Sequence, residues 1–156
     1  MSISINDFKS SYIIGIGGSG MSSIAKYLFQ RGLKVSGYDQ RGSYVTNLLN
    51  NDGINVDFDM SKATYSKETL YIVSSAIDMK STSLSSFVNQ PNVLTRPNFL
   101  KLLSESVDVI GITGTHGKTS TSALLAHIFK FNDIDISYIY GGVTSFNGIG
   151  GHYGDK

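Results

Sequence analysis

The sequence predicts an α/β fold built on a mainly parallel, Rossmann-like sheet. Short apolar runs alternate with segments of helical apolar spacing along the chain, which is the pattern of consecutive βα units. Two of these units carry a glycine-rich loop between strand and helix, at residues 15–20 and 114–119. Loops of this kind hold phosphate, because their N–H groups and the helix N-terminus attract anions. We therefore expect two phosphate-binding loops on one α/β chain.

Composition excludes several other classes of protein. The chain has 156 residues, of which 40% are hydrophobic, enough for one domain and part of another. Its net charge of +1 gives no reason to expect nucleic acid or an anionic membrane as a partner. The absence of cysteine excludes disulfides, thiolate metal sites and a cysteine nucleophile. Without a signal-peptide pattern or an apolar run of about 20 residues, we expect a cytoplasmic protein that does not enter a membrane.

The first forty residues predict a right-handed βαβ unit. Residues 12–16 form an apolar run that ends in glycines, as buried parallel strands do. Apolar side chains at helical spacing follow over residues 21–28, and Gly32 is a suitable end for that helix. Residues 33–38 then predict a second strand that ends at Asp39.

Weaker patterns continue the alternation along the rest of the chain. Pro97 suits the first turn of a helix, and the run from Val107 predicts a buried strand. We expect the glycine-rich tail, residues 141–156, to be mobile because it lacks core residues and a sheet neighbour. The other predicted strands are 54–58, 70–73, 92–95 and 136–140, and the other predicted helices are 44–50, 81–89 and 118–131.

We place a domain boundary near Ser106. Residues 1–106 would form a Rossmann-like domain, and residues 107–156 the start of a P-loop domain. Two strands and one helix are too few to cover both faces of a nucleotide-binding sheet. We therefore expect a nearly complete first domain followed by the beginning of a second.

The first loop fits the pattern G-x-G-x-x-G through Gly15, Gly17 and Gly20. Such glycines allow a tight turn and a close approach of the backbone to a diphosphate. Asp39 ends the next strand, where an acid that binds a ribose would lie. The pattern alone leaves three alternatives open: NAD, another diphosphate ligand, or tight packing without a ligand.

The second loop is a variant of the P-loop. Ile112 occupies the position where the strict G-x-x-x-x-G-K-[ST] pattern has its first glycine. Lys118 can still reach the β- and γ-phosphates of a nucleotide, and Thr119 can bind Mg²⁺. The alternative is a glycine-rich turn with a solvated lysine. His116 could contact the nucleotide or solvent, and the three histidines are too scattered in sequence to predict a metal cluster.

Taken together, the two loops resemble the signatures of the Mur ligase family. The resemblance covers nearly the whole chain in the family's order. Within the family, the loops are most similar to the member that joins L-alanine to UDP-N-acetylmuramate. A sister ligase that recycles a peptide, an NAD-dependent dehydrogenase and a non-catalytic UDP-sugar-binding module remain alternatives. The matching segments are residues 14–25, 36–39, 74–77, 111–120 and 141–143, with Arg96 before its apolar helix.

The resemblance implies an ATP-dependent ligase of peptidoglycan biosynthesis with three domains. ATP would phosphorylate the lactyl carboxylate of the UDP-sugar, the amine of L-alanine would attack the acyl phosphate, and phosphate would leave. ATP and Mg²⁺ are the implied cofactors, and UDP-N-acetylmuramate, ATP and L-alanine the implied small-molecule substrates. The diphosphate at the first loop would then belong to UDP, and no nicotinamide would be needed.

The same resemblance implies two groups of site residues. In the second loop, Lys118 would stabilise charge on the transferring phosphoryl group and Thr119 would bind Mg²⁺. The implied ATP-binding residues are Gly114, Thr115, His116, Gly117, Lys118, Thr119 and Ser120. The implied UDP-sugar-binding residues are Gly15, Gly17, Gly18, Ser19, Gly20, Met21, Asp39, Ser74, Ser75, Ala76, Ile77 and Arg96.

The chain departs from the family pattern in two respects. Ser23 and Pro97 occupy positions where we expect smaller or non-proline residues, which we interpret as ordinary drift. The family's acidic strand, its modified lysine and its third domain would lie beyond Lys156. We therefore expect the N-terminal part of a ligase, able to bind the UDP-sugar without turnover.

Overall fold

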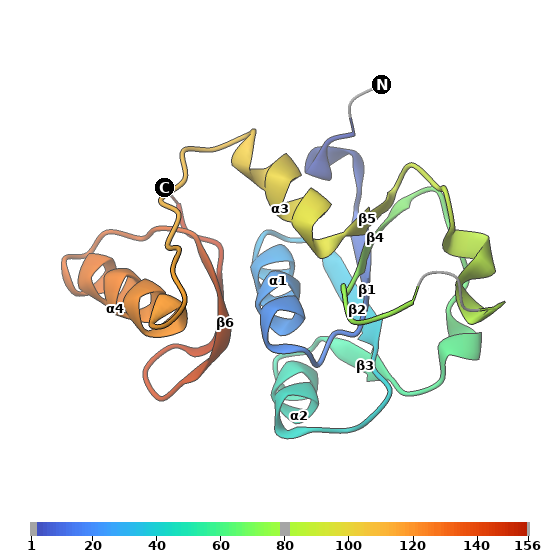
Figure 1. The fold of residues 1–156 in the computed structure, drawn as a ribbon, viewed down its shortest axis with the longest axis horizontal. Helices are drawn as coiled ribbons and strands as arrows, with labels where there is room; N and C mark the ends of the chain where they lie inside the picture. The colour runs from blue at the N-terminus through green and yellow to red at the C-terminus, as the bar shows by residue number, and fades with distance from the viewer. Residues whose placement is uncertain (1–2, 79–81, 156) are drawn as a thin grey trace.

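A five-stranded parallel sheet forms the centre of the computed structural model, which describes residues 3–78 and 82–155 (Figure 1). The strand order is β3-β2-β1-β4-β5, and every neighbouring pair is parallel. This confirms the predicted α/β fold class. The strands are β1 (Ser10–Ile14), β2 (Lys34–Tyr38), β3 (Asn55–Asp57), β4 (Thr69–Val73) and β5 (Val93–Thr95).

Helices cover the sheet unequally. The α-helices α1 (Ser19–Gln30), α2 (Tyr44–Asn51) and α3 (Arg96–Ser104) lie on one side, and Pro97 is in the first turn of α3 as predicted (Figure 1). The described residues also form short 3₁₀ helices: η1 (Ile5–Asp7), η2 (Met60–Lys62) and η3 (Thr82–Phe87). The helix predicted over residues 81–89 is therefore a 3₁₀ helix, and Ser81 lies outside the described residues.

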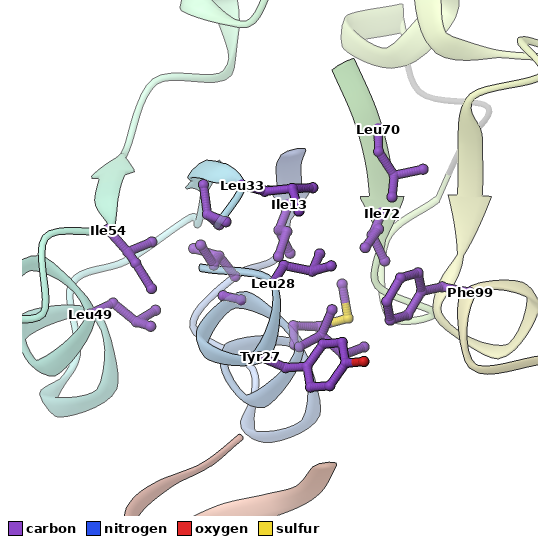
Figure 2. Packing of buried hydrophobic residues seen from close by; sticks show 14 of the residues in the cluster. Ile13, Tyr27, Leu28, Leu33, Leu49, Ile54, Leu70, Ile72 and Phe99 are labelled. Atoms are coloured by element: carbon purple, nitrogen blue, oxygen red, sulfur yellow. The ribbon is translucent and has the colours of Figure 1, made fainter. Parts of the chain in front are cut away.

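Two apolar clusters hold the sheet from its two faces. Alternation along β1 directs Ile13 to one face and Ile14 to the other, because successive side chains of a strand point in opposite directions. Ile13 packs with Leu28 of α1 and Phe99 of α3 in the larger cluster (Figure 2). The smaller cluster, on the face without α-helices, comprises Ile14, Tyr71, Val73, Leu84 and Phe87.

The strand predicted from Val107 is wrong. Residues 107–113 have no regular secondary structure, and Val107, Val109 and Ile110 are 52, 59 and 67% exposed. A strand is stable only when a neighbour accepts and donates its backbone hydrogen bonds. No strand of the described residues lies beside this segment, since the sheet ends at β5 and β3. An apolar run alone was therefore not sufficient to predict a strand here.

Residues 141–156 were expected to be mobile because they lack core residues and a sheet neighbour, and both of these reasons are wrong. After α4 (Lys118–Phe131), strands β6 (Tyr138–Thr144) and β7 (Gly148–His152) form an antiparallel hairpin between α4 and α1 (Figure 1). Ile149 is only 1% exposed and belongs to the larger cluster. The glycines of β7 allow this packing, because a Cβ on Gly151 would lie 1.9 Å from the carbonyl oxygen of Ser23 in α1.

Candidate functional site

The first glycine loop joins the end of β1 to the start of α1. Gly15 has φ +82, and its N–H donates to the Tyr38 carbonyl at 2.7 Å. A tight turn follows, in which Gly18 N–H donates to the Gly15 carbonyl at 3.1 Å. Gly18 is the N-cap of α1 and has no side chain to cap it. The first N–H groups of a helix have no partner within the helix, so this turn favours an anion.

Asp39 fixes the conformation of this loop. It follows β2, the strand beside β1, and its Oδ2 accepts a hydrogen bond from Gly17 N–H at 2.7 Å. A Cβ on Gly17 would lie 2.9 Å from that same oxygen, so the contact requires glycine. The predicted acid and the predicted glycine are therefore in direct contact. Part of the hydrogen-bonding capacity of Asp39 is directed to the loop itself.

A cleft of about 650 Å³ lies at the carboxyl ends of the strands, beside the loop. The chain moves outward from β1 to β2 and β3, then returns to β4 on the other side of β1. Ligands of open α/β sheets bind at such a reversal of strand order. Of the predicted UDP-sugar residues, the cleft is lined by Gly15, Gly17, Gly18, Asp39, Ser74, Ala76 and Ile77.

The other predicted UDP-sugar residues lie outside the lining of the cleft. Met21 is buried in the core of the sheet domain, so its side chain is committed to packing. Ser75 lies between two lining residues in the loop after β4. Ser19, Gly20 and Arg96 lie around the first turn of α1. The cleft and this turn are therefore two regions on the same glycine loop.

Arg96 brings a positive charge to the start of α1. It is the first residue of α3, whose N-cap Thr95 accepts from Asn98 N–H at 3.4 Å. Its guanidinium lies against Gly20, where an added Cβ would be 2.6 Å from the Arg96 Cζ. The Arg96 Nε is buried and has no hydrogen-bond partner among the described residues. The guanidinium and the helix N-terminus both favour a bound anion there.

Sequence reasoning missed several residues that line the cleft. Arg41 is exposed there, and its N–H donates to the Oδ1 of Asp39 at 3.4 Å. Arg41 lies two residues after Asp39, the acid that ends the second predicted strand, and this position could have identified it as a residue of the cleft. The other missed lining residues include Tyr38, Gln40, Ser43, Met60 and Leu84.

The second glycine loop precedes α4 and is open to solvent. Gly117 is the N-cap of α4 with φ +78, a conformation that favours glycine. Lys118 Nζ donates to the carbonyl of Gly114 and, at 3.1 Å, to that of Thr115. The ammonium therefore folds back over its own loop, where it would meet a phosphate. All the predicted ATP-binding residues, from Gly114 to Ser120, are exposed.

The described residues contain no cluster of three or more histidine and acidic side chains able to hold a metal ion. Thr119, in the first turn of α4, carries an exposed hydroxyl next to Lys118. This arrangement fits a cation such as Mg²⁺ that arrives bound to a nucleotide, because such a cation needs few protein ligands. Within residues 3–78 and 82–155, no helix is long and apolar enough to cross a membrane.

The parallel sheet and the cleft at its reversal of strand order define a Rossmann-like α/β protein with a phosphate-type glycine loop. Within that class, the chain belongs to the Mur ligase family. Residues 10–107 match the family described as "Mur ligase family, catalytic domain".

Known proteins similar to the chain carry consistent names. It is 37% identical over 144 residues to a UDP-N-acetylmuramate–L-alanine ligase of Porphyromonas gingivalis, covering 88% of this chain and 32% of the relative. It is 32% identical over 148 residues to the ligase of the same name in Flavobacterium johnsoniae, covering 91% of this chain and 33% of the relative. The chain thus spans about a third of the length of these relatives.

Solved structures show the same fold. The UDP-N-acetylmuramate-alanine ligase of Thermotoga maritima has a TM-score of 0.80 and 25% identity, covering 94% of this chain and 35% of that one. A UDP-N-acetylmuramate:L-alanyl-gamma-D-glutamyl-meso-diaminopimelate ligase from Neisseria meningitides has a TM-score of 0.77 and 28% identity, covering 94% and 47% respectively.

Proposed function

We propose that this chain provides the UDP-sugar-binding part of an ATP-dependent ligase that joins L-alanine to UDP-N-acetylmuramate in peptidoglycan synthesis. The observation that carries the proposal is the cleft at the carboxyl ends of β1, β2 and β4, bordered by a glycine loop that opens a helix. Membership of the Mur ligase family supports it and accounts for the second glycine loop, which an NAD-binding protein would leave unexplained.

In this proposal, the UDP moiety occupies the cleft and the start of α1. The N–H groups at the start of α1 would donate to the diphosphate, because those of Gly15, Gly17 and Gly18 already donate to partners within the fold. Arg96, whose Nε lacks a partner in the described structure, would add a charge-assisted hydrogen bond to the anion. Asp39, which lines the cleft, would keep the loop in its binding conformation through its hydrogen bond with Gly17 N–H.

The second loop would bind ATP. Lys118 would exchange the carbonyl oxygens of Gly114 and Thr115 for phosphate oxygens, and it would stabilise charge on the transferring phosphoryl group. The exposed Thr119 hydroxyl would hold Mg²⁺, which when bound offsets the negative charge of the β- and γ-phosphates. The N–H groups that follow Gly117 would cradle the same oxygens.

We also propose that the 156-residue chain binds its ligands without turnover. The second loop is exposed throughout, and residues 107–113 before it have no strand beside them in the described structure. Phosphoryl transfer needs charge stabilisation in a site from which water is excluded. The curated relatives are about three times as long as this chain, which leaves room in them for the remaining groups.

A second candidate function is the peptide-recycling ligation carried out by a sister enzyme. The TM-score of 0.77 with the Neisseria ligase is nearly as high as that with the Thermotoga alanine ligase. Both of these ligases are named for UDP-N-acetylmuramate, so the two functions would share the cleft and differ in the group that attacks the acyl phosphate. The names of the curated relatives favour L-alanine.

Calorimetry tests the proposed function. The 156-residue chain should bind UDP-N-acetylmuramate with one-to-one stoichiometry and a Kd below about 1 mM. ATP with Mg²⁺ should bind independently, and Lys118→Ala should weaken only the ATP titration. The proposal would be refuted if neither ligand bound to the chain. It would also be refuted if NADH competed with the UDP-sugar.

A phosphate-release assay tests the absence of turnover. With UDP-N-acetylmuramate, ATP, Mg²⁺ and L-alanine all present, the chain should release no phosphate above the rate of a reaction without L-alanine. Release that depends on L-alanine would show that the chain is a complete enzyme.

A further inference from the structure

A second cavity, of about 360 Å³, lies at the end of the sheet opposite the cleft. Its floor begins at the first residues of three neighbouring strands, which stand side by side in register: Lys34 of β2, Ser10 of β1 and Thr69 of β4. The cleft lies at the carboxyl ends of these strands, and the two sites share no lining residue. This amino-end cavity is therefore separate from the proposed UDP-sugar site.

The sheet face beneath the amino-end cavity is polar where a parallel sheet is usually apolar. The next row of the floor is Ser36, Tyr12 and Tyr71, again one residue each from β2, β1 and β4. Side chains two residues apart in a strand share a face, so both rows point to the side without α-helices (Figure 1). Strands at the centre of a parallel sheet are normally apolar on both faces. Packing alone does not explain this concentration of hydroxyl and ammonium groups.

Another wall of the cavity is a segment that hydrogen bonds hold in place. Tyr71 Oη donates to the Thr64 carbonyl at 2.8 Å and accepts from Ser66 N–H at 2.9 Å. Asn92, which is 3% exposed, donates from its Nδ2 to the Ser66 carbonyl at 2.8 Å. The lining residues of this segment are Lys62, Ala63, Thr64 and Ser66. The cavity is therefore formed before any ligand binds.

Tyr12 brings an unused hydrogen-bond donor to the lining of the cavity. Its Oη is buried and has no hydrogen-bond partner among the described residues. A buried hydroxyl without a partner costs free energy, so a ligand that accepts from it would remove that cost. Burial, with a smaller contribution from the charge of Asp57, raises the pKa of Tyr12 to about 12. The phenol therefore keeps its proton at neutral pH and can donate it in a hydrogen bond.

The remaining donors of the cavity favour an anion. Lys34 and Lys62 are exposed at its edge, and neither forms an ion pair in the part of the chain that the structure describes. The Ser10 Oγ and the Thr69 Oγ1 lie 2.9 Å apart, so one hydroxyl donates to the other and the second proton remains available. None of the described lining residues is acidic. A phosphate group suits these donors, because its oxygens accept several hydrogen bonds at once.

We propose that the amino-end cavity binds the phosphate group of a small phosphomonoester, such as a sugar phosphate. Lys34 and Lys62 would offset the charge of the phosphate, and the Tyr12 hydroxyl would donate to one of its oxygens. The hydroxyls of Ser36 and Thr64 would contact the rest of the molecule. A volume of about 360 Å³ is near the lower end for small-molecule sites, so the ligand is smaller than a nucleotide. The inference thus goes beyond the proposed function, since it concerns neither the UDP-sugar nor ATP.

An NMR titration of the isotope-labelled 156-residue chain with glucose 6-phosphate tests the inference. A signal for each residue is needed because the two glycine loops also favour phosphate. We expect saturable shifts of the backbone amides of residues 10–12 and 34–36, with a Kd of about 1 mM. Glucose, which lacks the phosphate, should leave these amides unshifted.

Two variants and a control identify the groups that hold the phosphate. Tyr12→Phe removes only the unpartnered hydroxyl, so the Kd should rise about tenfold while the melting temperature stays the same or increases. The double substitution Lys34→Gln and Lys62→Gln should raise the Kd more than tenfold. Lys67→Gln removes an exposed lysine outside the lining and should change the Kd less than about twofold.

The inference is wrong if glucose 6-phosphate shifts only the amides of the glycine loops, or if glucose shifts the cavity amides equally. An unchanged Kd in the double lysine variant would also refute it. That variant decides the question if Tyr12→Phe does not fold, because both lysines are exposed. Shifts at the cavity in a chain that does not bind UDP-N-acetylmuramate would refute the proposed function and support this inference.

Discussion

Asp39 acts on the first glycine loop through a single short hydrogen bond to Gly17 N–H. Asp39→Ala leaves this partly buried N–H without its acceptor, so we expect a loss of about 1–2 kcal/mol in the free energy of unfolding. Urea denaturation measures that loss. Asp39→Asn keeps an acceptor oxygen of the same reach and is the matched control, expected to lose less than half as much. If Asp39→Ala were as stable as the original chain, the carboxylate would have no structural role.

Individual residues were predictable where the backbone itself demands a residue type. Gly15 and Gly17 were found from their spacing, because a positive φ at one and a close approach to Asp39 at the other exclude a side chain. Ser23 was interpreted as drift, yet its hydroxyl connects α1 to β6. Its partner lies 117 residues away, and no local pattern reports such a contact.

Among the elements, the β6–β7 hairpin gives the clearest test of packing. Gly151→Ala would place a methyl group against the backbone of Ser23, which cannot move without disturbing α1. We expect a loss of about 3 kcal/mol or more in the free energy of unfolding, at the upper end of overpacking effects. Gly111→Ala is the matched control, since nothing lies within 4 Å of its added Cβ, and it should change stability by less than about 1 kcal/mol. Equal unfolding midpoints in urea for the two variants would contradict this packing.

The end of the same hairpin should respond to acid. The Oδ1 of Asp135 lies 2.7 Å from the Nε2 of His152 in β7, and this hydrogen bond lowers the pKa of Asp135 below its usual 3.8. A carboxyl group with a lowered pKa in the folded state stabilises the protein above its usual pKa, and the stabilisation is lost as pH falls through the lowered value. The chain should therefore melt at a higher temperature than Asp135→Asn at pH 6, and the difference should diminish as the pH falls below 3.8. A difference that persisted undiminished in acid would show that Asp135 acts without its charge.

Elements that depend on contacts with distant parts of the sequence were harder to predict than elements with a clear local pattern. Strand β4 was predicted to within one residue and β1 two residues too late, because an apolar run between polar turns indicates a strand in the middle of a sheet without fixing its ends. Residues 107–113 show an equally apolar pattern, but no described strand lies beside them. Conversely, the glycines of β7 resemble a flexible tail, whereas Gly151 is needed for close contact with α1.

At the scale of the whole molecule, the sheet domain and the segment around α4 differ in how well they cover their apolar side chains. The sheet and the helices on it bury most of their large apolar side chains in two clusters. The side chains that helix α4 buries are the small Ala123 and Ala126, which pack with Tyr140 of β6, while Leu125 and Phe129 are half-buried. Leu124, Ile128 and Phe131, spaced to lie along one face of the helix, are 57, 49 and 81% exposed. Exposed apolar faces of this kind usually mark a surface that a partner or another part of a protein covers.

This exposed face of α4 should bind a hydrophobic dye while the chain is fully folded. We expect the 156-residue chain at neutral pH to enhance the fluorescence of ANS, which binds exposed apolar surface. The double substitution Ile128→Lys and Phe131→Lys should lower that fluorescence and change the free energy of unfolding by less than about 0.5 kcal/mol, because both side chains are largely exposed. Ser85→Lys, which adds a charge at an exposed position in η3, should leave the fluorescence unchanged. If the double variant bound the dye as strongly as the original chain, or unfolded, the apolar face of α4 would not be the exposed surface that the structure shows.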